Sequence, residues 1–167
     1  MIEFSKLIIG SLDTTLPVSR SYSLVSFGNN ATLDLDLADT SEEMVLALDG
    51  LVYSGGKTNH AAAISACHTS LVSSGTDNTR KNIMLLITDG YPSVPVDMPQ
   101  AFAENAATAA KSDGVFIIPI TIKLQFTPEP TPYLQRISSD GTALDVSDFG
   151  VLDGIEKELI AQVSCQV

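Results

Sequence analysis

The sequence predicts an α/β fold: a doubly wound, mostly parallel sheet with helices on both faces. Two observations point to this class. Residues 83–87 and 115–122 are almost wholly apolar runs, which are typical of parallel strands that are covered on both faces. Segments with helical periodicity alternate with these strands, and such alternation indicates a sheet between layers of helices. The length of 167 residues, 44% of them hydrophobic, predicts one domain over 1–167.

The chain is expected to open on a helix and continue into a β-hairpin. Apolar residues recur at helical spacing from Phe4 to Leu12, which predicts a short amphipathic helix over 2–12. The segment YSLVSF at 22–27 has the composition of a strand. After the turn GNN, leucine and aspartate alternate over 32–37, which indicates an edge strand with one face toward water.

Two more helices are expected next. Thr40 and Glu43 have the spacing of a capping box, and a periodic apolar stripe follows them. A glycine-rich turn then leads to a helix over 61–72, for which Thr58 or Asn59 is the expected N-cap.

The second half of the chain alternates in the same way. Pro119 has no N–H to donate, so the strand containing it is expected to lie at a sheet edge or to bulge there. The expected elements are a strand at 83–87, an alanine-rich helix that begins near Pro99 and ends at Gly114, a strand at 115–122, a short helix at 132–137, a short strand at 142–146 and a closing helix at 151–163.

Charge and hydropathy exclude two classes of partner. The net charge is -11, and nine lysines and arginines are too few for the clustered basic surface that binds nucleic acid. No apolar run approaches the roughly 18 residues that cross a bilayer, so direct membrane insertion is not expected. The opening residues MIEFSKLIIGSL also lack the basic and long apolar regions of a signal peptide.

Two polar motifs fall where ligands bind in α/β sheets. Asp89 and Gly90 directly follow an apolar strand, and the carboxyl ends of parallel strands are the usual binding edge of such sheets. Thr58 precedes a helix. Each residue taken singly has a plain structural explanation, as a turn or an N-cap, so a functional interpretation depends on the two together.

Together the motifs resemble a known family. GGKTNHAAAI at 55–64, followed by IMLLITDGYPS at 83–93, resembles the von Willebrand factor type A (VWA) domain, which is shared by integrin inserted domains and by matrix proteins such as collagen VI and matrilins. The resemblance covers nearly the whole chain. It implies a Rossmann-like fold and a protein-binding or adhesion module, not an enzyme.

The resemblance also implies a metal-ion-dependent adhesion site. In the family a DxSxS motif, a threonine and an aspartate hold Mg²⁺, or Mn²⁺ or Ca²⁺ in its place. Thr58 matches the threonine and Asp89 the aspartate, and both supply the oxygen ligands that hard cations prefer. An acidic residue of a partner, for example a matrix protein, would complete the coordination. The residues expected at the rim are Ser54, Lys57, Asn59, His60, Tyr91 and Ser93.

One part of the family pattern is missing. The family's first strand lies at the centre of the sheet, between the strands that correspond to 22–27 and 83–87, and it carries the DxSxS motif. Neither is present in this sequence. We therefore expect an N-terminally truncated domain with that central strand missing. Metal binding is expected to be weak or absent unless the motif is supplied.

Two features favour an extracellular or cell-surface location. Asn30, followed by alanine and threonine, is a glycosylation sequon on a predicted turn. Secreted members of the family often join the two ends of the domain by a disulfide, which would pair Cys165 with a segment upstream of Met1 and fits a place in a larger multidomain protein.

Three alternatives remain. The domain could be an intracellular scaffolding VWA domain, with a free Cys165, or a structural VWA domain without metal. An α/β hydrolase-type enzyme is disfavoured because the sequence has no GxSxG, GxGxxG or GxxxxGK[ST] motif. His60 and His68 are expected at exposed helix positions and not in a zinc site.

Overall fold

The fold is α/β, as predicted. The computed structural model describes residues 1–15, 20–53, 55–73, 81–122, 130–146, 157 and 159–161. In chain order the elements are α1 (Ile2–Thr15), β1 (Tyr22–Phe27), β2 (Ala31–Ala38), α2 (Ser41–Gly50), α3 (His60–Ser73), β3 (Asn82–Thr88), α4 (Pro99–Ser112), β4 (Val115–Ile122), α5 (Thr131–Ile137) and β5 (Leu144–Val146).

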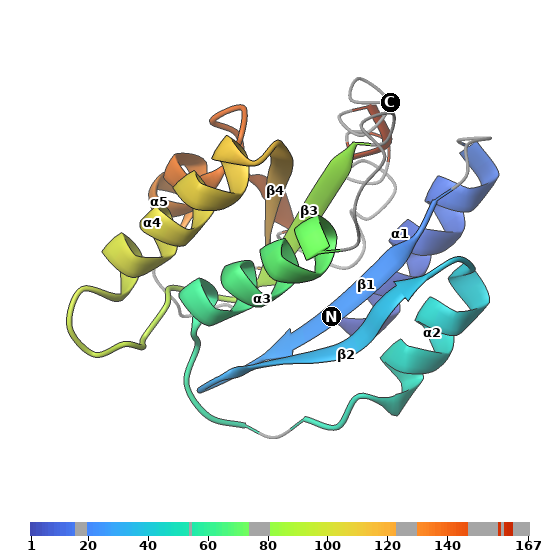
Figure 1. Ribbon diagram of the computed structural model, residues 1–167, viewed down its shortest axis with the longest axis horizontal. Coiled ribbons are helices and arrows are strands. Elements are labelled where there is room, and N and C mark those ends of the chain that lie inside the picture. The colour runs from blue at the N-terminus through green and yellow to red at the C-terminus, as the bar shows by residue number, and fades with distance from the viewer. Residues whose placement is uncertain are drawn as a thin grey trace.

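The strands form two separate groups (Figure 1). β3, β4 and β5 make a parallel sheet in that order, and β1 and β2 make an antiparallel hairpin. Within the described residues, β1 pairs only with β2, and β3 pairs only with β4. Residues of both β1 and β3 line one cavity. The expected gap at the centre of the sheet therefore lies between these two strands.

Two hydrophobic cores cover the two faces of the parallel sheet. Along β4, Ile118 and Ile120 point to a core that α1 covers with Phe4 and Ile8. The alternate residue Ile117 points to the opposite core, which α3, α4 and α5 cover. This alternation follows from the pleat of a strand, which directs successive side chains to opposite faces. A strand buried on both faces needs an apolar residue at nearly every position, as in β4.

β2 is the outer strand of the hairpin, as its alternating sequence predicted. Most of its residues from Thr32 to Asp36 are exposed. The carboxylate of Asp34 accepts a hydrogen bond from the backbone N–H of Ser26 at 2.7 Å, and that of Asp36 accepts one from the Ser70 hydroxyl at 2.6 Å. These aspartates thus anchor the hairpin to itself and to α3.

Thr40 is the N-cap of α2, as its sequence position predicted, and Glu43 bonds the Thr40 hydroxyl instead of the Thr40 backbone N–H of a full capping box. The Thr40 hydroxyl accepts a hydrogen bond from the Glu43 backbone N–H at 3.3 Å and donates one to the Glu43 carboxylate at 3.0 Å. The side chain therefore satisfies one of the backbone donors that a helix leaves unpaired in its first turn.

Replacement of Thr40 by alanine is expected to lower the free energy of unfolding by about 1 kcal/mol, because one of those donors loses its acceptor. Urea denaturation would measure the change. Thr69→Ala is a suitable control, because the Thr69 hydroxyl bonds the Ser65 carbonyl within α3 and caps nothing. Equal losses in the two variants would contradict a capping role for Thr40.

Pro119 corrects one expectation. β4 is neither an edge strand nor bulged at this position, since its pairing with β3 runs without interruption from Asn82 and Val115 to Thr88 and Thr121. The pairing with β5 begins only at Ile120. The proline is tolerated because no β5 residue stands opposite it, so no ladder hydrogen bond is lost there.

The remaining helices agree with the prediction where they are described. α1 continues three residues beyond the expected 2–12, to Thr15. The predicted closing helix at 151–163 is described only at Lys157 and 159–161, which are helical. None of the helices in the described ranges has the length and hydropathy needed to cross a membrane.

Candidate functional site

The turn that carries Asp89 is held in place by the residue before it. Thr88, the last residue of β3, is only 2% exposed. Its hydroxyl donates to the Gly90 carbonyl at 3.2 Å and accepts from the Gly90 N–H at 3.4 Å. Asp89 therefore leaves the buried strand on a turn with a defined direction.

His60, the first residue of α3, contacts this turn from the protein interior, through the Thr88 hydroxyl. It is fully buried, and its Nε2 lies 2.9 Å from the Thr88 hydroxyl while its Nδ1 lies 2.9 Å from the Tyr133 hydroxyl. Each ring nitrogen of His60 thus has one hydroxyl partner inside the protein. A chain of hydrogen bonds therefore runs from Tyr133 in α5 through His60 and Thr88 to the Asp89 turn.

Burial fixes the protonation of this chain. Desolvation lowers the pKa of His60 to about 4, so the imidazole is neutral at pH 7. Burial also raises the pKa of Tyr133 above its ordinary value, so its hydroxyl keeps its proton. The rings of Tyr133 and Phe27 lie 5.8 and 5.7 Å from the imidazole. Aromatic rings thus surround the imidazole beneath the Asp89 turn. Both imidazole nitrogens are hydrogen-bonded.

The placement of His60 corrects the expectation that it lies at an exposed position on the rim. A side chain with no exposed surface cannot contact a partner, and both ring nitrogens are already bonded inside the protein. His68 is also less exposed than expected: its side chain is 19% exposed and its Nε2 lies 2.9 Å from the Asp113 carboxylate. No sequence pattern distinguished these two histidines.

The loop that carries Thr58 is tied to the segment after Asp89. The Thr58 N–H donates to the Ser93 hydroxyl at 3.0 Å. The Thr58 carbonyl accepts from the N–H groups of Ser93 at 2.8 Å and Val94 at 3.2 Å. Thr58 and Asp89 also line the same cavity. The structure therefore brings the Thr58 loop and the Asp89 loop to one edge of the sheet.

Asn29, in the turn between β1 and β2, clamps the same loop from the other side. Its side-chain oxygen accepts from the Lys57 N–H at 2.8 Å, and its carbonyl accepts from the Asn59 side chain at 3.0 Å. Gly56 has φ of 106°, and a Cβ there would lie 3.1 Å from the Asn29 side-chain oxygen. Asn59 also accepts from the Ala62 N–H at 3.0 Å, which confirms it as the N-cap of α3.

The other predicted residues have varied surroundings. Lys57 and Ser93 are exposed, whereas Tyr91 is half-buried with its ring 5.9 Å from that of Tyr133. Asn30 is exposed in the hairpin turn, the position expected for a sequon. Ser54 and Cys165 lie outside the described residues.

The oxygen atoms at this edge are of the types that bind a hard cation, but they are too few to complete its coordination. Thr58 and Asp89 offer a hydroxyl and a carboxylate, the chemistry that Mg²⁺ takes. Among the residues that the structure describes, no group of three or more histidine, cysteine, aspartate or glutamate side chains could hold a metal ion. Any cation here would keep most of its coordination positions for water or for another molecule.

The fold and this edge define the class of protein. A parallel sheet covered on both faces, with a threonine loop and an aspartate loop joined at its carboxyl ends, is an α/β domain with a binding edge. The sequence matches the family model of the von Willebrand factor type A domain over residues 1–158. The chain belongs to this family.

Solved structures have the same fold. Proximal thread matrix protein 1 from the mussel byssus superposes with a TM-score of 0.78 at 23% identity, over 96% of this chain and 41% of that one. A second structure of the same protein has zinc in its metal-ion-dependent adhesion site (MIDAS) motif. It superposes with a TM-score of 0.75 at 24% identity, over 96% of this chain and 41% of that one. Manganese-loaded TRAP protein of Plasmodium vivax superposes with a TM-score of 0.67 at 16% identity, over 95% of this chain and 64% of that one. The SpRpn10 VWA domain superposes with a TM-score of 0.64 at 16% identity, over 93% of this chain and 80% of that one.

The chain thus spans less than half the length of the byssus protein that it matches. No curated protein sequence matches it in a direct comparison.

Proposed function

We propose that this chain is a single-domain protein-interaction module that holds a divalent cation at the carboxyl edge of its sheet and presents it to an acidic group of a partner protein. Thr58 and Asp89 are the proposed ligands. The observation that carries the proposal is the set of hydrogen bonds that joins the Thr58 backbone to Ser93, four residues after Asp89. Zinc and manganese in two structural neighbours support the same chemistry.

The charge of the chain supports a cation between the two partners. With a net charge of -11, the domain repels an acidic partner. A bound Mg²⁺, or Mn²⁺ or Ca²⁺, would reverse the local charge and leave positions open for a partner carboxylate. Lys57, Asn59 and Ser93 lie on the adjoining loops and form the proposed rim, together with Tyr91.

We propose an extracellular or cell-surface location for the domain. The exposure of Asn30 supports it, since a glycan needs an exposed asparagine. The match to a matrix protein of the mussel byssus supports it as well.

Isothermal titration with Mg²⁺ tests the metal proposal. With two protein ligands we expect a Kd on the order of 1 mM, the weak end of the range for oxygen-ligand sites. Asp89→Ala should weaken binding at least about tenfold, because it removes the only charged ligand. Thr58→Ala should weaken it less, since a hydroxyl carries no charge.

Asp97→Ala provides the matched control. Asp97 is an exposed aspartate on the loop that follows Asp89, so the variant lowers the negative charge equally without removing a ligand. If Asp97→Ala weakens binding as much as Asp89→Ala, the cation is held by general charge and the proposed site is wrong.

A metal-free structural VWA domain is the second candidate. The shortage of acidic ligands among the described residues favours it. Absence of any heat of binding up to about 10 mM Mg²⁺ would select this candidate, since even the weakest protein sites for such cations lie near 1 mM.

A further inference from the structure

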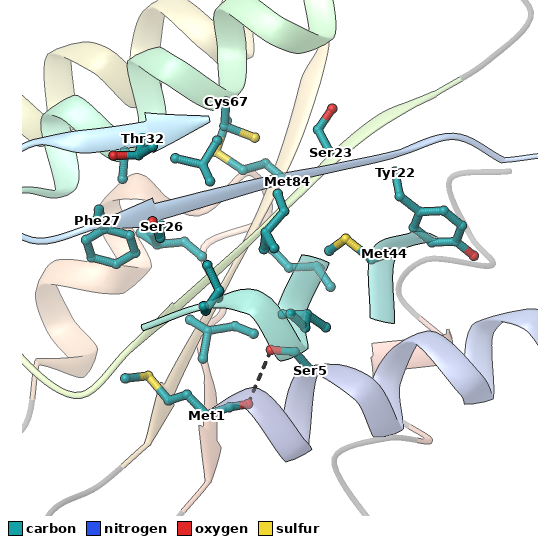
Figure 2. Close-up of a pocket in the computed structure, with 18 of the residues that line it drawn as sticks. Met1, Ser5, Tyr22, Ser23, Ser26, Phe27, Thr32, Met44, Cys67 and Met84 are labelled. Carbon is teal, nitrogen blue, oxygen red and sulfur yellow. Dashed lines mark hydrogen bonds between the residues drawn. The ribbon is translucent and has the colours of Figure 1, made fainter. Parts of the chain in front are cut away.

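Three large apolar side chains lie exposed on the segment that follows the Asp89 turn. Val96 is 74% exposed, Met98 72% and Phe102 52%, and we call these three residues the apolar patch. The Phe102 N–H donates to the Met98 carbonyl at 3.3 Å, so these two residues lie one helical turn apart. None of the three lines the cavity between β1 and β3, which Figure 2 shows, so the gap between those strands does not account for their exposure.

Phe102 lies outside the core-facing side of its helix. It is the one large apolar side chain in α4, and the buried apolar positions of this helix are the alanines at 103, 107 and 110. A surface helix normally turns its largest apolar residues toward the core. In α4 the small residues face the core and the phenylalanine faces solvent. Packing within the domain therefore does not explain Phe102.

Met98 departs from local preferences at its backbone and at its side chain. Its backbone is in the left-handed region, with φ of 55° and ψ of 50°, which a residue other than glycine adopts only at a cost. It stands at the N-cap of α4 without a side-chain hydrogen bond, although serine, threonine, aspartate and asparagine fill such positions best. Departures of this kind cluster at functional sites, where local stability is given up for an interaction.

The apolar patch begins close to the proposed cation site. The N–H groups of Ser93 and Val94 donate to the Thr58 carbonyl at 2.8 and 3.2 Å. Val96 and Met98 follow Val94 in the chain so closely that their Cα atoms lie at most about 7 and about 14 Å from that of Val94. In Figure 1 this loop, in yellow-green, extends outward between the starts of α3 and α4. One partner segment can therefore reach both places.

We propose that the apolar patch docks a large apolar side chain of the same partner protein whose acidic group reaches the cation. This inference rests on the proposed function, because the acidic group fixes one end of the partner segment. A span of about 14 Å, with a few ångströms more to the Thr58 side chain, corresponds to about four to six residues of an extended segment. The partner should carry its apolar residues at that spacing from its acidic residue.

The charge at the patch favours a basic residue beside the apolar ones. Asp97 is exposed and lies between Val96 and Met98 in the chain. The sequence contains no lysine or arginine between Lys81 and Lys111, so this segment has no basic side chain of its own for Asp97. A second copy of this chain fits poorly, because its patch carries the same aspartate and its net charge is also -11. A partner with apolar and basic residues is the better occupant.

NMR spectroscopy with synthetic peptides tests the proposal. The first probe has an aspartate, a four-residue glycine-serine spacer, two leucines and two lysines, in that order, and the second has the reverse order. Labelled methionine and valine methyl groups report directly on Met98 and Val96. In about 10 mM Mg²⁺ we expect at least one probe to shift both signals in a saturable way. Replacement of its two leucines by serines should weaken binding at least fivefold.

Met98→Asn separates binding from stability. Asparagine enters the left-handed region more readily than methionine and is a preferred N-cap residue, so the urea midpoint of unfolding should rise. The same substitution removes apolar surface, so probe binding, measured at the Val96 signals, should weaken at least fivefold.

Leu46→Asn is the matched control. Leu46 is 71% exposed and lies on α2, which packs on α1 and the hairpin, whereas α4 packs on α3, β4 and α5. This variant loses a similar apolar surface away from the patch, so it should change probe binding less than twofold.

The outcomes distinguish this proposal from the proposed function. Binding that needs Mg²⁺ but is equal in Met98→Asn and the unchanged protein would contradict the patch alone, as would absence of patch shifts in protein that binds Mg²⁺ by titration. Equal binding in Mg²⁺ and in EDTA would contradict the cation as the anchor, and with it the shared partner. A lower urea midpoint for Met98→Asn would show that Met98 stabilises the free domain and would overturn its role in binding. Patch shifts on dilution of the protein without a probe would assign the patch to a second copy instead.

Discussion

Replacement of Phe4 by alanine is expected to lower the free energy of unfolding by about 3–5 kcal/mol. Phe4 is 1% exposed and packs in the core that α1 shares with Ile118 and Ile120. It does not line the cavity between β1 and β3, so water cannot simply fill the space that the ring leaves. The loss would consume much of the roughly 5–15 kcal/mol that stabilises a typical domain.

Urea denaturation with linear extrapolation would measure this loss. Leu7→Ala is the control, because Leu7 lies on the same helix and is 37% exposed. It should cost about 1 kcal/mol or less. A Phe4→Ala variant no less stable than Leu7→Ala would contradict the docking of α1 on the parallel sheet.

Acid should destabilise the domain through His60. The unfolded imidazole has a pKa of 6.5, and burial lowers the folded value to about 4. The unfolded chain therefore binds the proton more tightly. The contribution of the neutral imidazole is complete above pH 6.5 and is lost as the pH falls toward 4. Between pH 7 and 4.5 the loss amounts to about 2–3 kcal/mol.

A comparison of two histidine variants isolates this effect. His60→Gln removes the titrating group, so its free energy of unfolding should fall less between pH 7 and 4.5 than that of the unchanged protein. His68→Gln should keep the acid loss due to His60, because this substitution leaves the buried His60 imidazole in place. Identical pH profiles for His60→Gln and the unchanged protein would show that the imidazole is not held neutral.

Local patterns allowed much of the fold to be predicted. The helix cap at Thr40, the alternation in β2 and the apolar runs of β3 and β4 each depend on residues close in sequence. The gap beside β1 was also expected, but from resemblance to the family and not from residue periodicity.

The interior of the candidate site was not predictable in the same way. His60 bonds Thr88 and Tyr133, which lie 28 and 73 residues away in the chain, so no local pattern reveals that it is buried. Asn29 holds a loop 28 residues away, and the sequence shows only a polar turn. Pro119 was misjudged because its tolerance depends on how far β5 extends.

The clamp formed by Asn29 places two predicted features on one surface. Asn29 contacts the loop that bears Thr58, and the sequon residue Asn30 is its neighbour in the chain and lines the same cavity. A glycan on Asn30 would stand beside the proposed cation. Protein from a glycosylating expression host and protein from a bacterial host would therefore differ at the surface where partners are expected to bind.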